Sequence, residues 1–303
     1  MQHHRPILAL GLRLVGAALL ATLLALVKYT AEQGIALPEI MFWRQAVSIP
    51  VLLGYLYATG NLSSLKTKRL PVHFRRAAMG MGNMAIVFLT TILLPLAVST
   101  TLSFTTPLFA VILSIALLHE KIGPWRWLAV ALGFLGIVAI MLPGAGGASD
   151  ISLIGAALGL LAAFIVALVN FQIRDLGRTE ANVTIVFYFA AFGTPMAAAF
   201  LPFYATAHDL TGWLLLLSIG TLGMLFQLCI SASVRFAPVA TVVVMDYSAI
   251  IWSTLWGWAV WDHLPSVATW LGAPLIIGAG MIIAWRERHH FRRAPPVTSA
   301  GID

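Results

Sequence analysis

Long apolar stretches, separated by short polar or Pro/Gly-rich breaks, run through almost the whole sequence. A helix that crosses a bilayer needs roughly 20 mainly apolar residues. Ten such stretches can be delimited, and the breaks between them are too short to hold a soluble domain. Their approximate bounds are 7–27, 37–57, 77–94, 98–118, 125–142, 153–171, 183–204, 214–233, 239–260 and 267–285. We therefore expect an all-α integral membrane protein with ten transmembrane helices.

The composition supports this class and excludes others. Of 303 residues, 60% are hydrophobic and only 10% are charged, against roughly 25% charged in an average soluble domain. So little charge cannot cover the surface of a soluble enzyme, a disordered chain or a nucleic-acid-binding domain. The single cysteine, Cys229, excludes a disulfide framework and a thiolate metal cluster. Since the sequence also lacks a P-loop and metal-spaced histidines, we expect no cofactor, no metal and no catalytic residue.

The distribution of basic residues predicts the orientation of the spans. With the N-terminus in the cytoplasm, all but two of the 18 Lys and Arg residues fall on cytoplasmic segments, as the positive-inside rule requires. The two exceptions, Lys28 and Arg44, flank the first outside loop. If one span were missed or added, the charge bias would be reversed in every later loop. The bias instead holds as far as the last helix. Both termini are therefore expected in the cytoplasm, and the net charge of +7 implies no nucleic-acid partner.

The two halves of the sequence are similar to each other. Glu120 and Asp262, each near the end of an apolar span, differ by 142 positions, and so do Gly136 and Gly278. Each half contains five spans, and an odd number reverses the orientation of the second half. Inverted repeats of this kind are typical of secondary transporters. We expect a first repeat over 1–146, a second over 147–290 and a disordered cytoplasmic tail over 291–303.

Two stretches carry a resemblance to a known family. Residues 99–144 (STTLSFTTPLFAVILSIALLHEKIGPWRWLAVALGFLGIVAIMLPG) resemble the end of an EamA domain, with a Pro-containing fourth helix, a terminal acidic residue and a Gly-rich fifth helix. Residues 232–265 (ASVRFAPVATVVVMDYSAIIWSTLWGWAVWDHLP) resemble the matching part of a second one, although Asp262 stands where the family more often has Glu. The resemblance covers nearly the whole chain. It implies the drug/metabolite transporter superfamily, with a central substrate cavity between the halves, and leaves the substrate open.

Asp246 is the most informative single residue. It lies about eight residues, or roughly 11 Å, into the ninth span, where a carboxylate facing lipid is unfavourable. Tyr247 follows it, and Trp252 lies six positions on. The group could carry a proton or contact a substrate amine, or it could be a structural hydrogen-bonding carboxylate. The nearest basic residue along its own helix, Arg235, is too far away for a direct pair. The partner of the Asp246 carboxylate must therefore come from another helix, or be a substrate or a proton.

Two cations and two amides complete the candidate site. Lys28 and Arg44 lie near the outer ends of the first two spans and could together attract a carboxylate or phosphate. The alternative is that both reach the headgroups and pair with nearby glutamates. Asn83 and Gln227, 144 positions apart, either line the cavity or bond between helices.

Pro107 interrupts the fourth span and predicts a kink or hinge there. The many Thr and Ser hydroxyls of that span are expected to bond their own helix backbone.

The sequence thus favours a secondary transporter in the bacterial inner membrane. It would move a small polar organic metabolite (an amino acid, S-adenosylmethionine or a vitamin-like solute) by alternating access, coupled to protons or to exchange. It would be a monomer or homodimer surrounded by membrane lipids. One alternative is a lipid-linked carrier or flippase of the same fold, which would require a lateral opening and a more basic groove. Another is a membrane-embedded transferase, for which the sequence lacks a catalytic cluster.

Overall fold

The computed structural model describes residues 6–118, 123–141, 152–177, 179–236 and 243–293, which contain helices and no strands. In the described residues, each of the ten predicted segments overlaps one helix or two consecutive helices, and 239–242 of the ninth segment lie outside those residues. The elements are α1 (Pro6–Glu32), α2 (Leu37–Ala46), α3 (Ser48–Ala58), η1 (Leu62–Leu65), α4 (Leu70–Leu93), α5 (Leu96–Ser103), α6 (Thr106–Leu118), α7 (Pro124–Met141), α8 (Leu153–Leu176), α9 (Asn182–Ala198), α10 (Leu201–Tyr204), α11 (Leu210–Phe236), η2 (Val243–Ser248), α13 (Ala249–Trp261) and α14 (Val267–Arg293).

Six helical segments of the described chain are long and apolar enough to cross a membrane, and shorter apolar helices accompany them. Their outward faces carry large apolar side chains, such as Val138 (54% exposed) and Trp270 (62% exposed). Apolar patches of this extent indicate a surface that contacts lipid. The protein is therefore an all-helical membrane protein.

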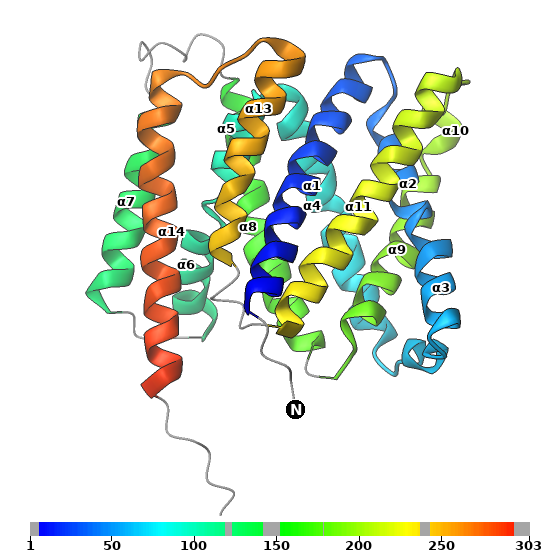
Figure 1. Ribbon diagram of the computed structural model, residues 1–303, viewed down its shortest axis with the longest axis horizontal. Helices are drawn as coiled ribbons and strands as arrows, with labels where there is room; N and C mark the ends of the chain where they lie inside the picture. Colours follow the sequence, from blue (N-terminus) through cyan, green and yellow to red (C-terminus); the bar gives the residue numbers. More distant parts are fainter. Residues whose placement is uncertain (1–5, 119–122, 142–151, 178, 237–242, 294–303) are drawn as a thin grey trace, which may run out of the picture.

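The helices run side by side, and α1 begins at the same edge of the molecule where α14 ends (Figure 1). In the described part of the chain, α1 packs against α11 and α13, while α8 packs against α4 and α6. Likewise α2 packs against α11, and α9 against α4. The pairs α2–α9 and α7–α14 also pack together. Under the repeat, the first of these contacts correspond in pairs: α1–α11 to α8–α4, α1–α13 to α8–α6, and α2–α11 to α9–α4.

The fourth and ninth predicted spans are each interrupted within the apolar region. α5 and α6 are separated at Phe104 and Thr105, whose N–H groups bond three residues back, to Thr101 and Leu102 (both 3.1 Å). Pro107 follows as the second residue of α6, where its missing N–H leaves no helical bond unmade. The second interruption is η2, a 3₁₀ segment that continues into α13. The kink expected at Pro107 thus lies directly before it.

The expected division between the repeats, at 146/147, lies outside the described residues, as does Glu120. α14 extends to Arg293, which is three residues into the segment expected to be a disordered tail. The rest of that segment, 294–303, also lies outside the described residues.

Candidate functional site

Asp246 forms an ion pair with Arg13 of α1. Arg13 donates from Nε to Oδ1 and from Nη2 to Oδ2, both at 2.6 Å, and the two side chains are 11% and 35% exposed. A bidentate pair of this kind is strong and geometrically specific. In the structure the partner comes from another helix, which is one of the three sources that the sequence left open. The sequence interpretation had counted Arg13 among the cytoplasmic cations, whereas the structure places it within α1, holding η2.

The two interrupted segments touch each other beside this pair. The Tyr247 ring lies edge-on to the Phe104 ring with centroids 5.0 Å apart, and Thr100 shares a 2.7 Å hydrogen bond with Ser253 of α13. Phe104 and Asp246 differ by 142 positions, the spacing of the repeat. The interruption in α5–α6 and that in η2 are therefore equivalent positions of the two halves, in contact with each other.

Other predicted residues of this region are less connected. The Tyr247 hydroxyl is buried, with no hydrogen-bond partner among the residues described. Trp252 is half-buried in α13 and forms no hydrogen bond among the described residues. The hydroxyls of Thr101 and Thr105 bond carbonyls of their own helix, as predicted.

Arg44 lies in a different part of the molecule from Asp246. It is 7% exposed, donates from Nη1 to Gln45 Oε1 (2.6 Å), and places its guanidinium 5.9 Å from the Phe189 ring of α9. Arg76 of α4, also buried (8% exposed), lies 4.1 Å from the same ring. The sequence interpretation missed Arg76, because it lies next to Arg75 in a basic run that was assigned to the cytoplasmic surface.

Lys28 is not part of this arrangement. Its Nζ donates to the Leu94 carbonyl at the end of α4 (2.7 Å) and lies 5.6 Å from the Trp261 ring. Lys28 and Arg44, expected at one cavity mouth, therefore contact different elements. Nor does Arg44 reach Glu39, whose carboxylate pairs with His208 instead (2.7 Å). The reason is that the Arg44 side chain packs against Gly223 of α11 and the α9 ring.

The two predicted amides lie on α4 and α11. Asn83 Oδ1 is buried, and the residues that the structure describes supply no hydrogen-bond partner for it. Gln227 is half-buried and forms no hydrogen bond among the described residues. The interhelical amide bonds that were one alternative for these residues are therefore not formed in the described structure.

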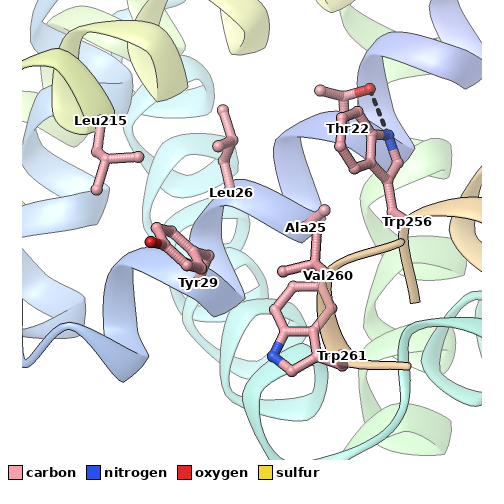
Figure 2. A pocket seen from close by; sticks show the side chains of 8 residues that line it. All are labelled: Thr22, Ala25, Leu26, Tyr29, Leu215, Trp256, Val260 and Trp261. Atoms are coloured by element: carbon pink, nitrogen blue, oxygen red, sulfur yellow. Dashed lines mark hydrogen bonds between the residues drawn. The ribbon is translucent and has the colours of Figure 1, made fainter. Parts of the chain in front are cut away.

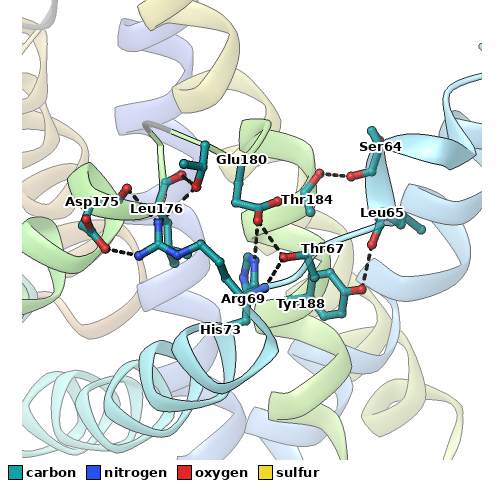
Figure 3. Close-up of polar contacts among 11 residues, drawn as sticks. Ser64, Leu65, Thr67, Arg69, His73, Asp175, Leu176, Glu180, Thr184 and Tyr188 are labelled. Atoms are coloured by element: carbon teal, nitrogen blue, oxygen red, sulfur yellow. Dashed lines mark hydrogen bonds and ion pairs between the residues drawn. The ribbon is translucent and has the colours of Figure 1, made fainter.

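Polar contacts join the halves near both edges of the molecule. At the edge where α4 begins, Thr67 donates to Glu180 (2.6 Å), with His73 Nε2 at 3.9 Å from the same carboxylate, and Arg69 pairs with Asp175 (Figure 3). We call these residues the loop cluster. At the start of α2 the corresponding contact is the Glu39–His208 pair. Glu39 and Glu180 are 141 positions apart, so the two carboxylates occupy nearly equivalent positions of the two halves.

A groove of about 210 Å³ opens between α1, α11 and α13. Its lining is apolar and aromatic, with one hydrogen bond from Trp256 Nε1 to Thr22 Oγ1 (3.0 Å) (Figure 2). The lining residues are Thr22, Ala25, Leu26, Tyr29, Leu215, Trp256, Val260 and Trp261. None of these lining residues is basic, and the Lys28 ammonium near the Trp261 ring is bonded to the Leu94 carbonyl.

Comparison with known families settles the class of the protein. The family described as "EamA-like transporter family" matches residues 7–142 and again residues 153–285. The chain belongs to the EamA-like transporter family. As the resemblance in the sequence implied, the two matches place one family copy in each half of this EamA-family protein.

Named relatives span most of the chain. A riboflavin transporter of Vibrio cholerae is 29% identical over 95% of this chain and 96% of its own. A pseudopaline exporter of Pseudomonas aeruginosa is 31% identical over 84% and 88%. An S-adenosylmethionine uptake transporter of Rickettsia bellii is 25% identical over 82% and 84%. A solved crystal structure of a protein matches 92% of this chain with a TM-score of 0.62 at 20% identity, which supports the fold alone.

These findings establish the coarse function. The EamA-family protein is a multi-pass transporter of small molecules in the bacterial inner membrane, and it is not an enzyme.

Proposed function

We propose that this EamA-family protein is a secondary transporter that moves a small polar organic metabolite by alternating access, driven by a proton gradient or by exchange. In this proposal ten spans form two inverted five-helix repeats, 1–146 and 147–290, and both termini are cytoplasmic. The same-edge positions of the start of α1 and the end of α14 support an even number of crossings (Figure 1).

The observation that carries the proposal is the contact between the two interrupted helical segments. Interrupted helices at matching positions of two repeats are the usual site of substrate and ion binding in such transporters. Here they meet at Phe104 and Tyr247, next to the Arg13–Asp246 pair. A proton on Asp246, or a substrate group that competes for either partner, would release η2 from α1. This link between binding and helix movement is what coupled transport requires.

The experiment is uptake into proteoliposomes with a panel of labelled amino acids, S-adenosylmethionine and riboflavin. For the substrate so found, Asp246→Asn is compared with the parent in gradient-driven accumulation and in exchange. If Asp246 carries the proton, Asp246→Asn retains exchange but loses accumulation and its pH dependence. If it binds a substrate amine, binding is lost at every pH. Transport equal to the parent's from mildly acidic to mildly alkaline pH would show that Asp246 is structural.

The lipid-linked carrier is the weaker alternative, because the groove in Figure 2 has no basic lining residue. Long-chain lipid phosphates should accordingly fail to compete with the metabolite in the same uptake assay.

A further inference from the structure

Arg44 and Arg76 are two buried cations for which the described residues supply no carboxylate. Both side chains are more than nine-tenths buried, at 7% and 8% exposure. By contrast, Arg13 pairs with Asp246 and Arg69 pairs with Asp175. An isolated buried charge costs several kcal/mol, so two of them close together should be retained for a purpose other than stability.

The two guanidiniums lie near the same aromatic ring, that of Phe189. Their central carbons lie 5.9 and 4.1 Å from the centroid of the Phe189 ring, so they are no farther apart than the sum of these distances. Arg44 Nε and two nitrogens of Arg76, Nε and Nη1, are buried and find no acceptor in the described part of the chain. Planar guanidinium groups with free N–H donors match the oxygens of a carboxylate or phosphate.

Glycines on three helices provide the space for these side chains. A Cβ atom at Gly80 of α4 would lie 2.7 Å from the Phe189 ring and 3.0 Å from Arg76 Nη1. One at Gly223 of α11 would lie 3.1 Å from Arg44 Cγ, and one at Gly193 of α9 would lie 2.7 Å from Gln45 Nε2. A larger residue at one of these positions would collide with the side chain just named for it. The observed positions of both arginines therefore depend on these glycines.

Asn83 belongs to the same helix face as Arg76 and Gly80. The spacing i, i+4, i+7 places the three residues along one side of α4. The Oδ1 atom of Asn83 is buried, and no residue of the described ranges donates a hydrogen bond to it. Asn83 therefore adds an acceptor, unpartnered among the described residues, to the face of α4 that carries Arg76.

We propose that Arg44 and Arg76 together bind an oxyanion group, a carboxylate or phosphate, of the transported solute, while Asn83 accepts a hydrogen bond from its neutral polar part. The proposal rests on the transport function proposed above and names the chemical class of its substrate. The deep burial of both guanidiniums assigns the oxyanion to a solute rather than to a lipid headgroup.

The test measures binding without transport. The full-length protein is placed in nanodiscs of phosphatidylcholine, and thermal unfolding is followed by tryptophan fluorescence. The probes are pairs that differ in an anionic group: FMN against riboflavin, and succinate against succinamide, at matched ionic strength. We expect an anionic member to raise the unfolding temperature and its neutral counterpart to leave it unchanged. Arg44→Met or Arg76→Met should weaken that binding at least tenfold. Arg75→Met, which removes an exposed charge one residue away, is the matched control and should bind like the parent.

The ligand-free proteins give a second, independent readout. If the two guanidiniums await an anion, Arg76→Met removes an unpaired buried charge and should raise the unfolding temperature of the empty protein. If no anion stabilises the parent and Arg76→Met lowers its unfolding temperature, the arginines are structural and the proposal is wrong. Stabilisation by phosphatidylglycerol nanodiscs in place of soluble anions would also overturn it, in favour of a headgroup site.

Counterflow in proteoliposomes separates this proposal from the transport function. A neutral or cationic solute that is transported equally by the parent, Arg44→Met and Arg76→Met would refute the anion site and leave the transport function standing. Anion binding by a parent that transports none of the panel would refute the transport function and leave the site standing.

Discussion

At the scale of single residues, the sequence predicts that a charge is buried but does not predict which residue it contacts. A carboxylate at the depth of Asp246 must find a partner, and the structure provides Arg13. Its identity could not be predicted, because the two residues are 233 positions apart and meet only through packing of α1 against η2. The same limit applies to Arg76. Its place in a basic run suggested the surface, and only the position of α9 shows that its side chain lies over Phe189.

The Arg13–Asp246 pair gives a prediction that separates stability from function. Asp246→Leu or Arg13→Met alone leaves a largely buried charge unpaired, and we expect each to lower stability by up to about 3 kcal/mol, since the carboxylate is partly exposed. The double variant removes both charges, so it should recover much of the stability in thermal unfolding and still fail to accumulate substrate.

The exposed Arg69–Asp175 pair supplies the control. Asp175→Asn should change the free energy of unfolding by less than about 1 kcal/mol. If the double variant of Arg13 and Asp246 transports like the parent, the pair only holds the helices together.

At the scale of helices, the length of the apolar stretches located the elements, because a span must be long and apolar whatever its neighbours are. The kink before Pro107 could also be predicted, since proline acts locally. The pairing of helices could not. In lipid, helices associate mainly through close packing of small residues rather than through hydrophobic burial. Which glycines lie at a helix–helix contact depends on how each helix is rotated about its axis, and the local sequence does not determine that rotation. Gly136 and Gly272 contact each other across the helix pair. Gly278 lies on the same helix as Gly272, yet a Cβ atom added there would have nothing within 4 Å.

The contact between α7 and α14 can be tested with two substitutions on the same helix. An added Cβ at Gly272 would lie 2.5 Å from the Gly136 carbonyl and 2.5 Å from Ile140 Cγ1. Because backbone must move to admit it, Gly272→Ala should lower the free energy of unfolding by about 1–3 kcal/mol. Gly278→Ala meets open space and should be neutral or stabilising by up to about 1 kcal/mol, since alanine favours the helix. Thermal unfolding in matched nanodiscs decides, and equal destabilisation by both would contradict this packing.

At the scale of the whole molecule, polar contacts join the halves at both edges. The loop cluster joins the start of α4 to the end of α8 and the residues before α9 (Figure 3). The Glu39–His208 pair joins α2 to the residues before α11. In the proposed alternating-access cycle, each contact would have to open on one side of the membrane while the other stays closed. The near-equivalence of Glu39 and Glu180 in the repeat makes the two closures comparable in chemistry.

Weakening one closure at a time should therefore shift the conformational equilibrium in opposite directions. Glu180→Gln removes the charge that Thr67 and His73 face, and Glu39→Gln removes the one that His208 contacts. A charged hydrogen bond contributes about 1.5–3 kcal/mol, and each 1.4 kcal/mol changes a population ratio about tenfold.

In a Cys229→Ala background, Asn83→Cys serves as the reporter because Asn83 lies midway along α4. A membrane-impermeant maleimide is then applied to sealed vesicles of either orientation. We expect Glu180→Gln to speed labelling about tenfold from the cytoplasmic side, and Glu39→Gln from the opposite side. Faster maleimide labelling from the same side in both variants would contradict the arrangement of two closures. Two variants that open opposite faces of the ligand-free protein cannot shift its conformational equilibrium in the same direction.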